Sequence, residues 1–419
     1  MKAESIQKIF LAYLSYIFIF AYFVNQYLFS SPFNSVIYLI IIPFIFSFNI
    51  LSLKKHKSLS LIILFHILLF VYYSTDLKSL FNISQIFVGI IFFSSLALLI
   101  VKNFKILEII YKIKKYLQNL LVISLILSTF LTFVKFPNFI DYYFWESLTS
   151  EKRLMLMSGG GGGHSSAVFL LPLLLCFYHY EYFKNNKNIK SLFLIIIVSI
   201  LCILTKSRIG YYSVIFVTLS SLLYLNFNFF RKFYSILIIL IGCFFVISSS
   251  LSNKYVNNHN NFFLDFIIST DKTRKNINTP NEFFSGRNIL NNYLISEIEK
   301  KPFFGSGHNT PLQNYGLDKE GFIAFYRDEK SVGRESPLML AFKYGIPYFL
   351  TFILFIFTIP LKIKGISLKH ESFLFQNIWM VCFLIIISGG GFTVMHSSSG
   401  FIFLMLSILY FIPKYEKIS

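Results

Sequence analysis

The chain is 419 residues long, with 55% hydrophobic, 19% aromatic and 14% charged residues and a formal net charge of +19. This composition excludes an ordinary soluble domain, because many apolar runs reach the roughly 20 residues with which a helix crosses a bilayer. It also excludes nucleic acid as the reason for the positive charge, since the lysines follow the short loops between apolar runs. We therefore predict an all-α polytopic membrane protein, because helices satisfy their own backbone hydrogen bonds in lipid.

In chain order, the apolar runs predict about twelve transmembrane helices. They lie at residues 7–29, 33–53, 58–74, 80–101, 117–136, 164–183, 190–205, 210–228, 233–251, 336–361, 372–390 and 397–412. Lysines and arginines concentrate in every second loop, and the positive-inside rule makes those loops cytoplasmic. We therefore expect a multi-pass membrane protein with its N- and C-termini in the cytoplasm.

One loop, between the ninth and tenth predicted helices, is far longer than the others and falls on the outer face. It contains eleven basic and nine acidic residues, so it is nearly neutral. Within it, apolar residues at helical spacing predict one helix over Phe283–Lys301, which Pro302 and Gly305 end. The chain thus divides into helices one to nine at 1–251, a loop subdomain at 252–334 and helices ten to twelve at 335–419.

Arginines on the outer side are candidates for binding an anion. Lys206 and Arg208 lie between the seventh and eighth predicted helices, where the loop is so short that Arg208 sits at membrane depth or at the headgroups. An ionisable residue there is costly and is a functional candidate by default. Arg287 begins the predicted loop helix and Arg334 precedes the tenth span, and a guanidinium fork matches pyrophosphate oxygens well. The competing interpretations are an arginine that snorkels to lipid phosphates, or surface pairs with acids such as Glu282.

Two residues on the outer side could act as a general base. Glu335 adjoins Arg334 at the start of the tenth predicted span, and a carboxylate beside arginines at a membrane edge can accept a proton. His308, which follows the Gly305–Gly307 segment, is the competing base. Glu335 could instead form a structural salt bridge, or be a helix-start carboxylate that the helix dipole favours.

Two glycine runs at outer membrane edges each lead to a histidine. Residues 158–166 contain His164 and residues 388–398 contain His396. The N–H groups of such runs could face a phosphate, which makes both histidines possible substrate contacts. Alternatively, both runs are ordinary loops in which a serine caps the helix that follows. No cysteine lies in an outer loop and no metal- or nucleotide-binding pattern is present, so we expect no metal and no cofactor.

The chain resembles the O-antigen polymerase and O-antigen ligase superfamily in its helix number, in its long loop after the ninth helix and in three motifs. The motifs are LTKSRIGYY at 204–212, SGRNILNNYLISEIEKKPFFGSG at 285–307 and GRESPLMLAFKYGIPYFL at 333–350. The resemblance implies a metal-independent, inverting glycosyltransferase at the periplasmic face of the bacterial inner membrane. It also implies a glycan on undecaprenyl pyrophosphate as donor, with Arg208, Arg287 and Arg334 at the positions that bind the pyrophosphate.

One departure from the ligase pattern favours a polymerase. The ligases carry a histidine a short distance before the glycine that corresponds to Gly345, and here that place holds Glu335 and Ser336. The open alternatives are an O-antigen ligase with lipid A-core as acceptor, a polysaccharide flippase or transporter, and a non-catalytic scaffold. The implied partners are the undecaprenyl-pyrophosphate-linked oligosaccharide, membrane lipids, a chain-length regulator and a flippase, and no nucleic acid.

Overall fold

The computed structural model describes residues 56–134, 145–148, 151–154, 166–185, 188–205, 208–226, 228–250, 287–307, 338–364, 366, 369–386 and 397–415. Helices make up nearly all of this part of the chain, and one two-stranded sheet accompanies them there. The helical class that the composition predicts is confirmed.

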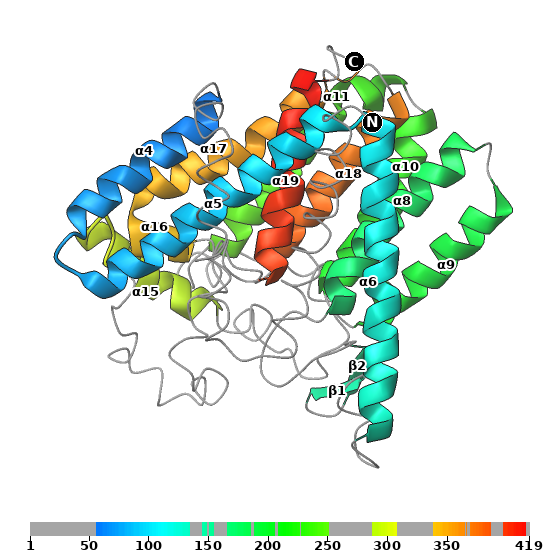
Figure 1. The fold of residues 1–419 in the computed structure, drawn as a ribbon, viewed down its shortest axis with the longest axis horizontal. Coiled ribbons are helices and arrows are strands. Elements are labelled where there is room, and N and C mark those ends of the chain that lie inside the picture. The colour runs from blue at the N-terminus through cyan, green and yellow to red at the C-terminus, as the bar shows by residue number, and fades with distance from the viewer. Residues whose placement is uncertain are drawn as a thin grey trace, which may run out of the picture.

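The helices run back and forth along the molecule, as Figure 1 shows. They are α4 (Lys57–Tyr72), α5 (Leu77–Asn103), α6 (Ile106–Val134), α8 (Ser166–Lys184), α9 (Ile189–Leu204), α10 (Arg208–Asn226), α11 (Asn228–Ser250), α15 (Arg287–Lys300), α16 (Leu338–Tyr344), α17 (Ile346–Ile363), α18 (Lys369–Ile385) and α19 (Ser397–Tyr415). Helices that follow each other in the sequence, such as α8 and α9 or α10 and α11, are joined by short connections and pack against each other, as antiparallel helices do. The C-terminal helix α19 packs along α5 and closes the bundle.

A helix occupies every predicted span that lies within the described residues, whereas 7–29 and 33–53 lie outside them. Two boundaries need correction. Helix α6 begins at Ile106, well before the predicted 117, because charged residues interrupt the apolar run there without ending the helix, and residues 106–116 contain no proline or glycine. The predicted span 336–361 is two helices, α16 and α17, divided at Gly345, whose φ of 92° lies outside the helical region.

Large apolar side chains are exposed on several helices. They include Leu64 on α4, Phe193 on α9, Leu240 on α11 and Leu354 on α17. Such surface favours lipid over water. Among the described residues, Ile346–Ile363 is the one helix that is by itself long and apolar enough to cross a membrane, and other apolar helices there are shorter. The architecture is compatible with an α-helical membrane protein, while the number of spans and the topology stay predictions.

The core is built around α8, α18 and α19. Their side chains at 170–180, 371–386 and 402–412 are all buried. Aromatic rings pack between helices: the ring of Phe357 on α17 lies 5.9 Å from that of Trp379 and 5.4 Å from that of Phe383, both on α18, centroid to centroid. The indole N–H of Trp379 donates to the carbonyl oxygen of Ile356 on α17 at 2.9 Å, which ties α18 to α17.

Polar side chains inside the core pair across helices. The hydroxyl groups of Tyr234 and Ser220 donate to Oδ1 of Asn377 at 2.7 and 2.9 Å. The neighbouring Gln376 donates through Nε2 to Oγ of Ser235 at 2.9 Å. Because a buried polar group is costly unless it is hydrogen-bonded, these pairs favour one alignment of α10 and α11 against α18.

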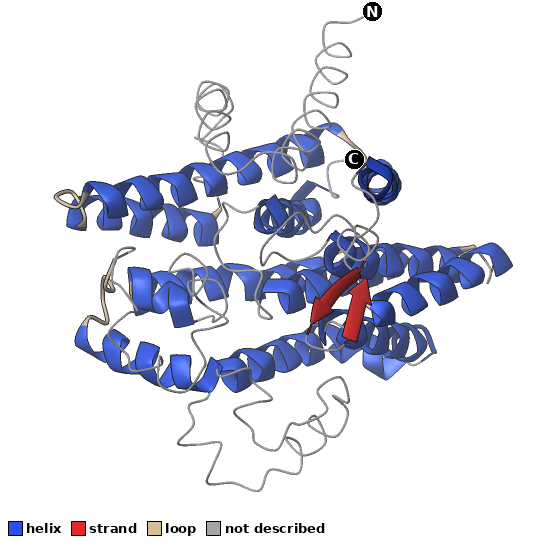
Figure 2. Ribbon diagram, turned by 90° about the horizontal axis from the view of Figure 1, so that it is seen from below, coloured by secondary structure: helices blue, strands red, loops and turns tan. Residues whose placement is uncertain are grey.

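A small hairpin lies in the connection between α6 and α8. Strands β1 (Trp145–Leu148) and β2 (Glu151–Leu154) pair antiparallel, with Trp145 opposite Leu154 and Leu148 opposite Glu151. Figure 2 shows them as two arrows against the surrounding helices. Strands of four residues carry too little alternation of apolar and polar residues to stand out in a sequence.

Candidate functional site

Helix α15, which carries the middle motif, packs on α16. Leu294 and Ile298 are four residues apart and therefore lie on one face of the helix. They are 0% and 7% exposed, and they form a small apolar cluster with Ala341 and Phe342 of α16. The loop helix predicted over 283–301 is thus confirmed, with bounds of 287–300. It lies against the chain that leads into α17.

A tight turn, Lys301–Gly307, follows α15 and is shaped by proline and glycine. Pro302 has no N–H with which to continue the helix. The N–H of Gly305 donates to the carbonyl oxygen of Lys301 at 3.1 Å, which bends the chain back. Gly305 and Gly307 take φ values of 72° and 84°, a region that favours glycine. The prediction that Pro302 and Gly305 end the helix is confirmed.

The turn docks on the end of α16 through backbone hydrogen bonds. The N–H groups of Ser306 and Gly307 donate to the carbonyl oxygens of Phe342 and Lys343 at 2.8 and 3.1 Å. The last carbonyl groups of a helix have no partner within that helix. The turn therefore supplies donors that α16 lacks, and it acts as a C-terminal cap from a distant part of the sequence.

Gly345 lets the turn reach the start of α17 as well. The N–H of Ile346, the first residue of α17, donates to the carbonyl oxygen of Pro302 at 2.8 Å. A Cβ atom on Gly345 would lie 2.0 Å from the carbonyl oxygen of Phe303, far inside van der Waals contact. Glycine is therefore required here twice, by its φ of 92° and by the close approach of the turn.

The end of α4 forms the third side of this assembly. The hydroxyl of Tyr73 donates to the carbonyl oxygens of Phe304 and Gly305, at 2.8 and 3.1 Å. The ring of Tyr72 stacks on the ring of Phe304 with centroids 4.3 Å apart. Figure 1 shows α15 and α16 beside the connection between α4 and α5. We call this assembly the turn junction: Tyr73, Lys301–Gly307 and Phe342–Ile346.

The arginine motif at 204–212 depends on a close approach of α9 and α10. Oγ1 of Thr205 donates to the carbonyl oxygen of Cys202 at 2.6 Å. A Cβ atom on Gly210 would lie 2.4 Å from that same oxygen and 2.7 Å from Oγ1 of Thr205. Arg208 is the first residue of α10, at the helix end whose N–H groups favour an anion. The glycine of this motif thus has a packing role beside its arginine.

The structure describes two of the predicted site residues, as the first residues of helices: Arg208 begins α10 and Arg287 begins α15. The others lie outside the described residues: Lys206, His164, His308, Arg334, Glu335 and His396. In the sequence, His308 directly follows the turn, and Glu335 is three residues before the start of α16. Both candidate bases are therefore covalently continuous with elements that meet at the turn junction.

Tyr73 is a residue that sequence reasoning missed. Its partner Phe304 is 231 residues away in the chain. A tyrosine at the end of an apolar run also has a common alternative interpretation, as an aromatic residue at the membrane interface. No spacing within the sequence connects the two segments, so only the fold reveals the contact.

A buried histidine of α4, His66, has a hydrogen-bond partner at each of its two ring nitrogens. Nδ1 of His66 lies 2.8 Å from the carbonyl oxygen of Ile62, and Nε2 lies 3.1 Å from the hydroxyl of Tyr348. A carbonyl oxygen can only accept, so Nδ1 carries the proton and Nε2 accepts from Tyr348 when the ring is neutral. The side chain ties α4 to α17.

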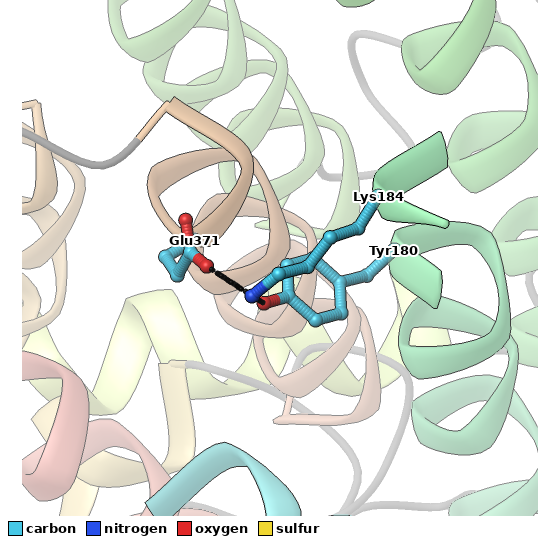
Figure 3. A network of polar contacts seen from close by, with 3 residues as sticks. All are labelled: Tyr180, Lys184 and Glu371. Atoms are coloured by element: carbon cyan, nitrogen blue, oxygen red, sulfur yellow. Dashed lines mark hydrogen bonds and ion pairs between the residues drawn. The ribbon is translucent and has the colours of Figure 1, made fainter. Parts of the chain in front are cut away.

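A polar group of a different kind lies where α8 ends and α18 begins (Figure 3). Glu371 is 4% exposed, and its Oε1 accepts hydrogen bonds from the Tyr180 hydroxyl at 2.7 Å and from Nζ of Lys184 at 2.9 Å. Glu371 precedes the predicted span 372–390. Burial alone would raise the pKa of its carboxyl, but the hydrogen bonds from Lys184 and Tyr180 lower that pKa below its usual value. We call Tyr180, Lys184 and Glu371 the lysine–glutamate cluster.

Within the described residues, no three His, Cys, Asp or Glu side chains are grouped so that they could hold a metal ion. Comparison with protein-family models, with characterised proteins and with solved structures finds no match for this chain. The motifs and the geometry that joins them are therefore the features of the chain that bear on its function.

Proposed function

We propose that the protein is an O-antigen (surface polysaccharide) polymerase of the bacterial inner membrane. In this proposal it transfers a growing glycan from undecaprenyl pyrophosphate to the terminal sugar of another lipid-linked repeat unit, at the periplasmic face. The partners are the lipid-linked oligosaccharide and membrane lipids, with a chain-length regulator and a flippase acting on the same pathway of assembly.

The observation that carries the proposal is that two motifs of the resemblance dock on each other. The motif at 285–307 ends in the turn, and the motif at 333–350 contains the junction of α16 and α17. The two exchange backbone hydrogen bonds of 2.8 to 3.1 Å. A transferase needs donor and acceptor groups held in one geometry, and a hydrogen-bonded junction between the turn of the long loop and the ends of α16 and α17 serves that need. The long loop and the arginines, predicted at one membrane face and not at the midplane, argue against the alternative of a transporter.

The proposed reaction is a single displacement. The hydroxyl oxygen of the acceptor sugar attacks the anomeric carbon of the donor, the bond from that carbon to the pyrophosphate oxygen breaks, and undecaprenyl pyrophosphate leaves. Arg208, Arg287 and Arg334 stabilise the negative charge that grows on the leaving group. Glu335 accepts the proton of the attacking hydroxyl, with His308 as the competing base.

Deletion of the gene, followed by gel separation of lipopolysaccharide, tests the proposal in cells. Loss of a polymerase leaves lipid A-core that carries single repeat units. Loss of a ligase leaves bare core together with lipid-linked polymer. Loss of a flippase leaves repeat units on the cytoplasmic side of the membrane, and either of the last two patterns would refute a polymerase.

The predicted topology is tested separately. A reporter that is active only outside the cytoplasm, fused at Asn278 in the long loop, should be active. A matched fusion at Lys187, in a lysine-rich loop predicted to be cytoplasmic, should be inactive. The reverse pattern would remove the loop from the face where the lipid-linked donor is proposed to bind.

A further inference from the structure

One phenolic hydroxyl lies where carbonyl oxygens from both docked segments converge. Tyr73 is 8% exposed, and its oxygen is 2.8 Å from the carbonyl oxygen of Phe304, 3.1 Å from that of Gly305 and 3.4 Å from that of Lys343. A phenol has one proton to donate, so the two shorter contacts share it as a three-centre bond. The third oxygen belongs to α16. The hydroxyl therefore touches both the turn and the helix on which the turn docks.

The ring of Tyr73 contacts the same turn, at Gly307. A Cβ atom on Gly307 would lie 3.2 Å from Cε1 of Tyr73 and 3.1 Å from Oγ of Ser79, so the backbone of the turn lies directly against both. Oδ1 of Asp76 accepts the N–H of Ser79 at 3.2 Å and caps the start of α5. The connection between α4 and α5 is thus a defined surface on which the turn rests.

We propose that Tyr73 is a positioning residue for glycan transfer, a role that rests on the proposed function. Its hydroxyl anchors the carbonyl side of the turn, while α16 holds the N–H side through Ser306 and Gly307. Held on two sides, the turn fixes where the chain emerges toward His308 and keeps α16 in register with α15. Tyr73 itself does not touch the reacting atoms in this proposal.

The test removes one hydroxyl and uses two matched tyrosines as controls. Tyr73→Phe keeps the ring against Gly307 and deletes the hydrogen bonds. Tyr72→Phe removes the neighbouring hydroxyl, on a side chain that is 49% exposed and whose ring stacks on Phe304. Tyr348→Phe removes a buried hydroxyl that bonds to His66, so it reports the cost of losing a buried tyrosine hydrogen bond elsewhere in the same bundle.

The first measurement is amide hydrogen exchange of the purified full-length proteins. In Tyr73→Phe, the amides of 305–307 should exchange about tenfold faster, because local opening of the turn becomes easier. The same amides should be unchanged in Tyr72→Phe and Tyr348→Phe. Unchanged exchange in Tyr73→Phe would overturn the inference, whatever the activity of the protein.

The second measurement is elongation of a defined undecaprenyl-linked repeat by the same proteins. Tyr73→Phe should lower kcat by about tenfold or more and leave KM for the donor within about twofold, because a misplaced group slows the reaction without weakening donor binding. A merely structural role would lower the amount of folded protein and leave kcat unchanged, and that result would overturn the positioning role. Wild-type protein that elongates nothing would refute the proposed function instead.

Discussion

The turn junction and the lysine–glutamate cluster lie at opposite ends of α17, and they hold their helices by different means. At the turn junction most of the bonds are between backbone groups, and the Tyr73 hydroxyl is the side-chain donor among them. Two glycines there, Gly305 and Gly345, lie so close to other backbone atoms that a Cβ atom does not fit. At the cluster the bonds are between side chains, with Lys184 and Tyr180 donating to Glu371. Backbone groups cannot move independently of the chain, so a shift of a helix breaks their hydrogen bonds. A long lysine side chain can instead change its conformation and keep its partner after a small shift of the helix.

This difference shows that charged side chains inside the bundle do not by themselves mark the functional site. The cluster contains a buried carboxylate with a positively charged partner, yet its hydrogen bonds are made within the protein and it ties α8 to α18. The turn junction contains mostly neutral backbone groups, yet it joins the two motifs on which the proposed chemistry depends. Damage at the turn junction should therefore change turnover or folding outright, and damage at the cluster should change stability by a modest amount.

The largest effect is expected for Gly345→Ala. The new Cβ atom would lie 2.0 Å from the carbonyl oxygen of Phe303 at a φ of 92°, and strain plus overpacking should cost about 3 kcal/mol or more. Most of the variant should fail to accumulate in the membrane. Gly242→Ala is a milder comparison, because its nearest contact is a side-chain carbon of Phe357 at 2.9 Å, whereas the nearest contact of Gly345 is a backbone oxygen at 2.0 Å. Normal accumulation of Gly345→Ala would show that the close approach is not needed for folding.

Arg208→Ala should abolish long-chain product while the protein still accumulates. The charge at the start of α10 would be lost, and with it the proposed contact to pyrophosphate. Arg208→Lys should rescue poorly, because an ammonium cannot form a fork across two phosphate oxygens. Arg231→Ala, on the side predicted to be cytoplasmic, is the matched control and should keep full activity. Full activity of Arg208→Ala would remove Arg208 from the site.

Glu335→Gln distinguishes a general base from a structural ion pair. If Glu335 accepts the proton, the variant should bind lipid-linked donor normally and turn over about a hundredfold more slowly. Binding and single-turnover rates of the purified protein measure the two quantities. Slow turnover in His308→Ala with normal turnover in Glu335→Gln would assign the base to His308. Loss of folded protein with unchanged specific activity would make Glu335 structural.

The smallest effect is expected at the lysine–glutamate cluster. Lys184→Met should destabilise the protein by about 1–2 kcal/mol, because it leaves a buried carboxylate with weaker compensation, and specific activity should be unchanged. Thermal unfolding of the detergent-purified protein measures the loss. Glu371→Gln combined with Lys184→Met should recover part of it. A loss of turnover without loss of stability would contradict the assignment of stability to the lysine–glutamate cluster and of turnover to the turn junction.

The same cluster predicts a pH dependence with a definite sign. The pKa of Glu371 is lowered in the folded protein, so its stabilisation is complete above the usual value of 4.5 and is lost as the pH falls through the lower folded value. The unfolding temperature of the wild type should therefore fall more steeply in acid than that of Lys184→Met. Equal slopes would mean that the ion pair contributes nothing measurable.

Local features of the chain were predictable from its residues alone. The helical class, the position of most described helices within a few residues, and the end of α15 at Pro302 and Gly305 follow from apolar periodicity, proline and glycine, whereas α6 begins at Ile106, well before the predicted 117. These signals are local, because each depends on residues within a few turns of one another. The break at Gly345 escaped the same reasoning, since an isolated glycine in an apolar run is also compatible with a continuous helix.

The turn junction was decided by tertiary structure. The sequence shows its three segments and even singles out two of them as motifs, but it does not show that Pro302 bonds to Ile346 or that Tyr73 bonds to Phe304. The first bond joins backbone groups that almost every residue possesses, so it leaves no mark in side-chain type. The second uses the hydroxyl of Tyr73, but its acceptor is a backbone carbonyl oxygen 231 residues away, so no local pattern connects the two. Which backbone groups meet depends on how α4, α15 and α17 pack, and that is a property of the whole bundle.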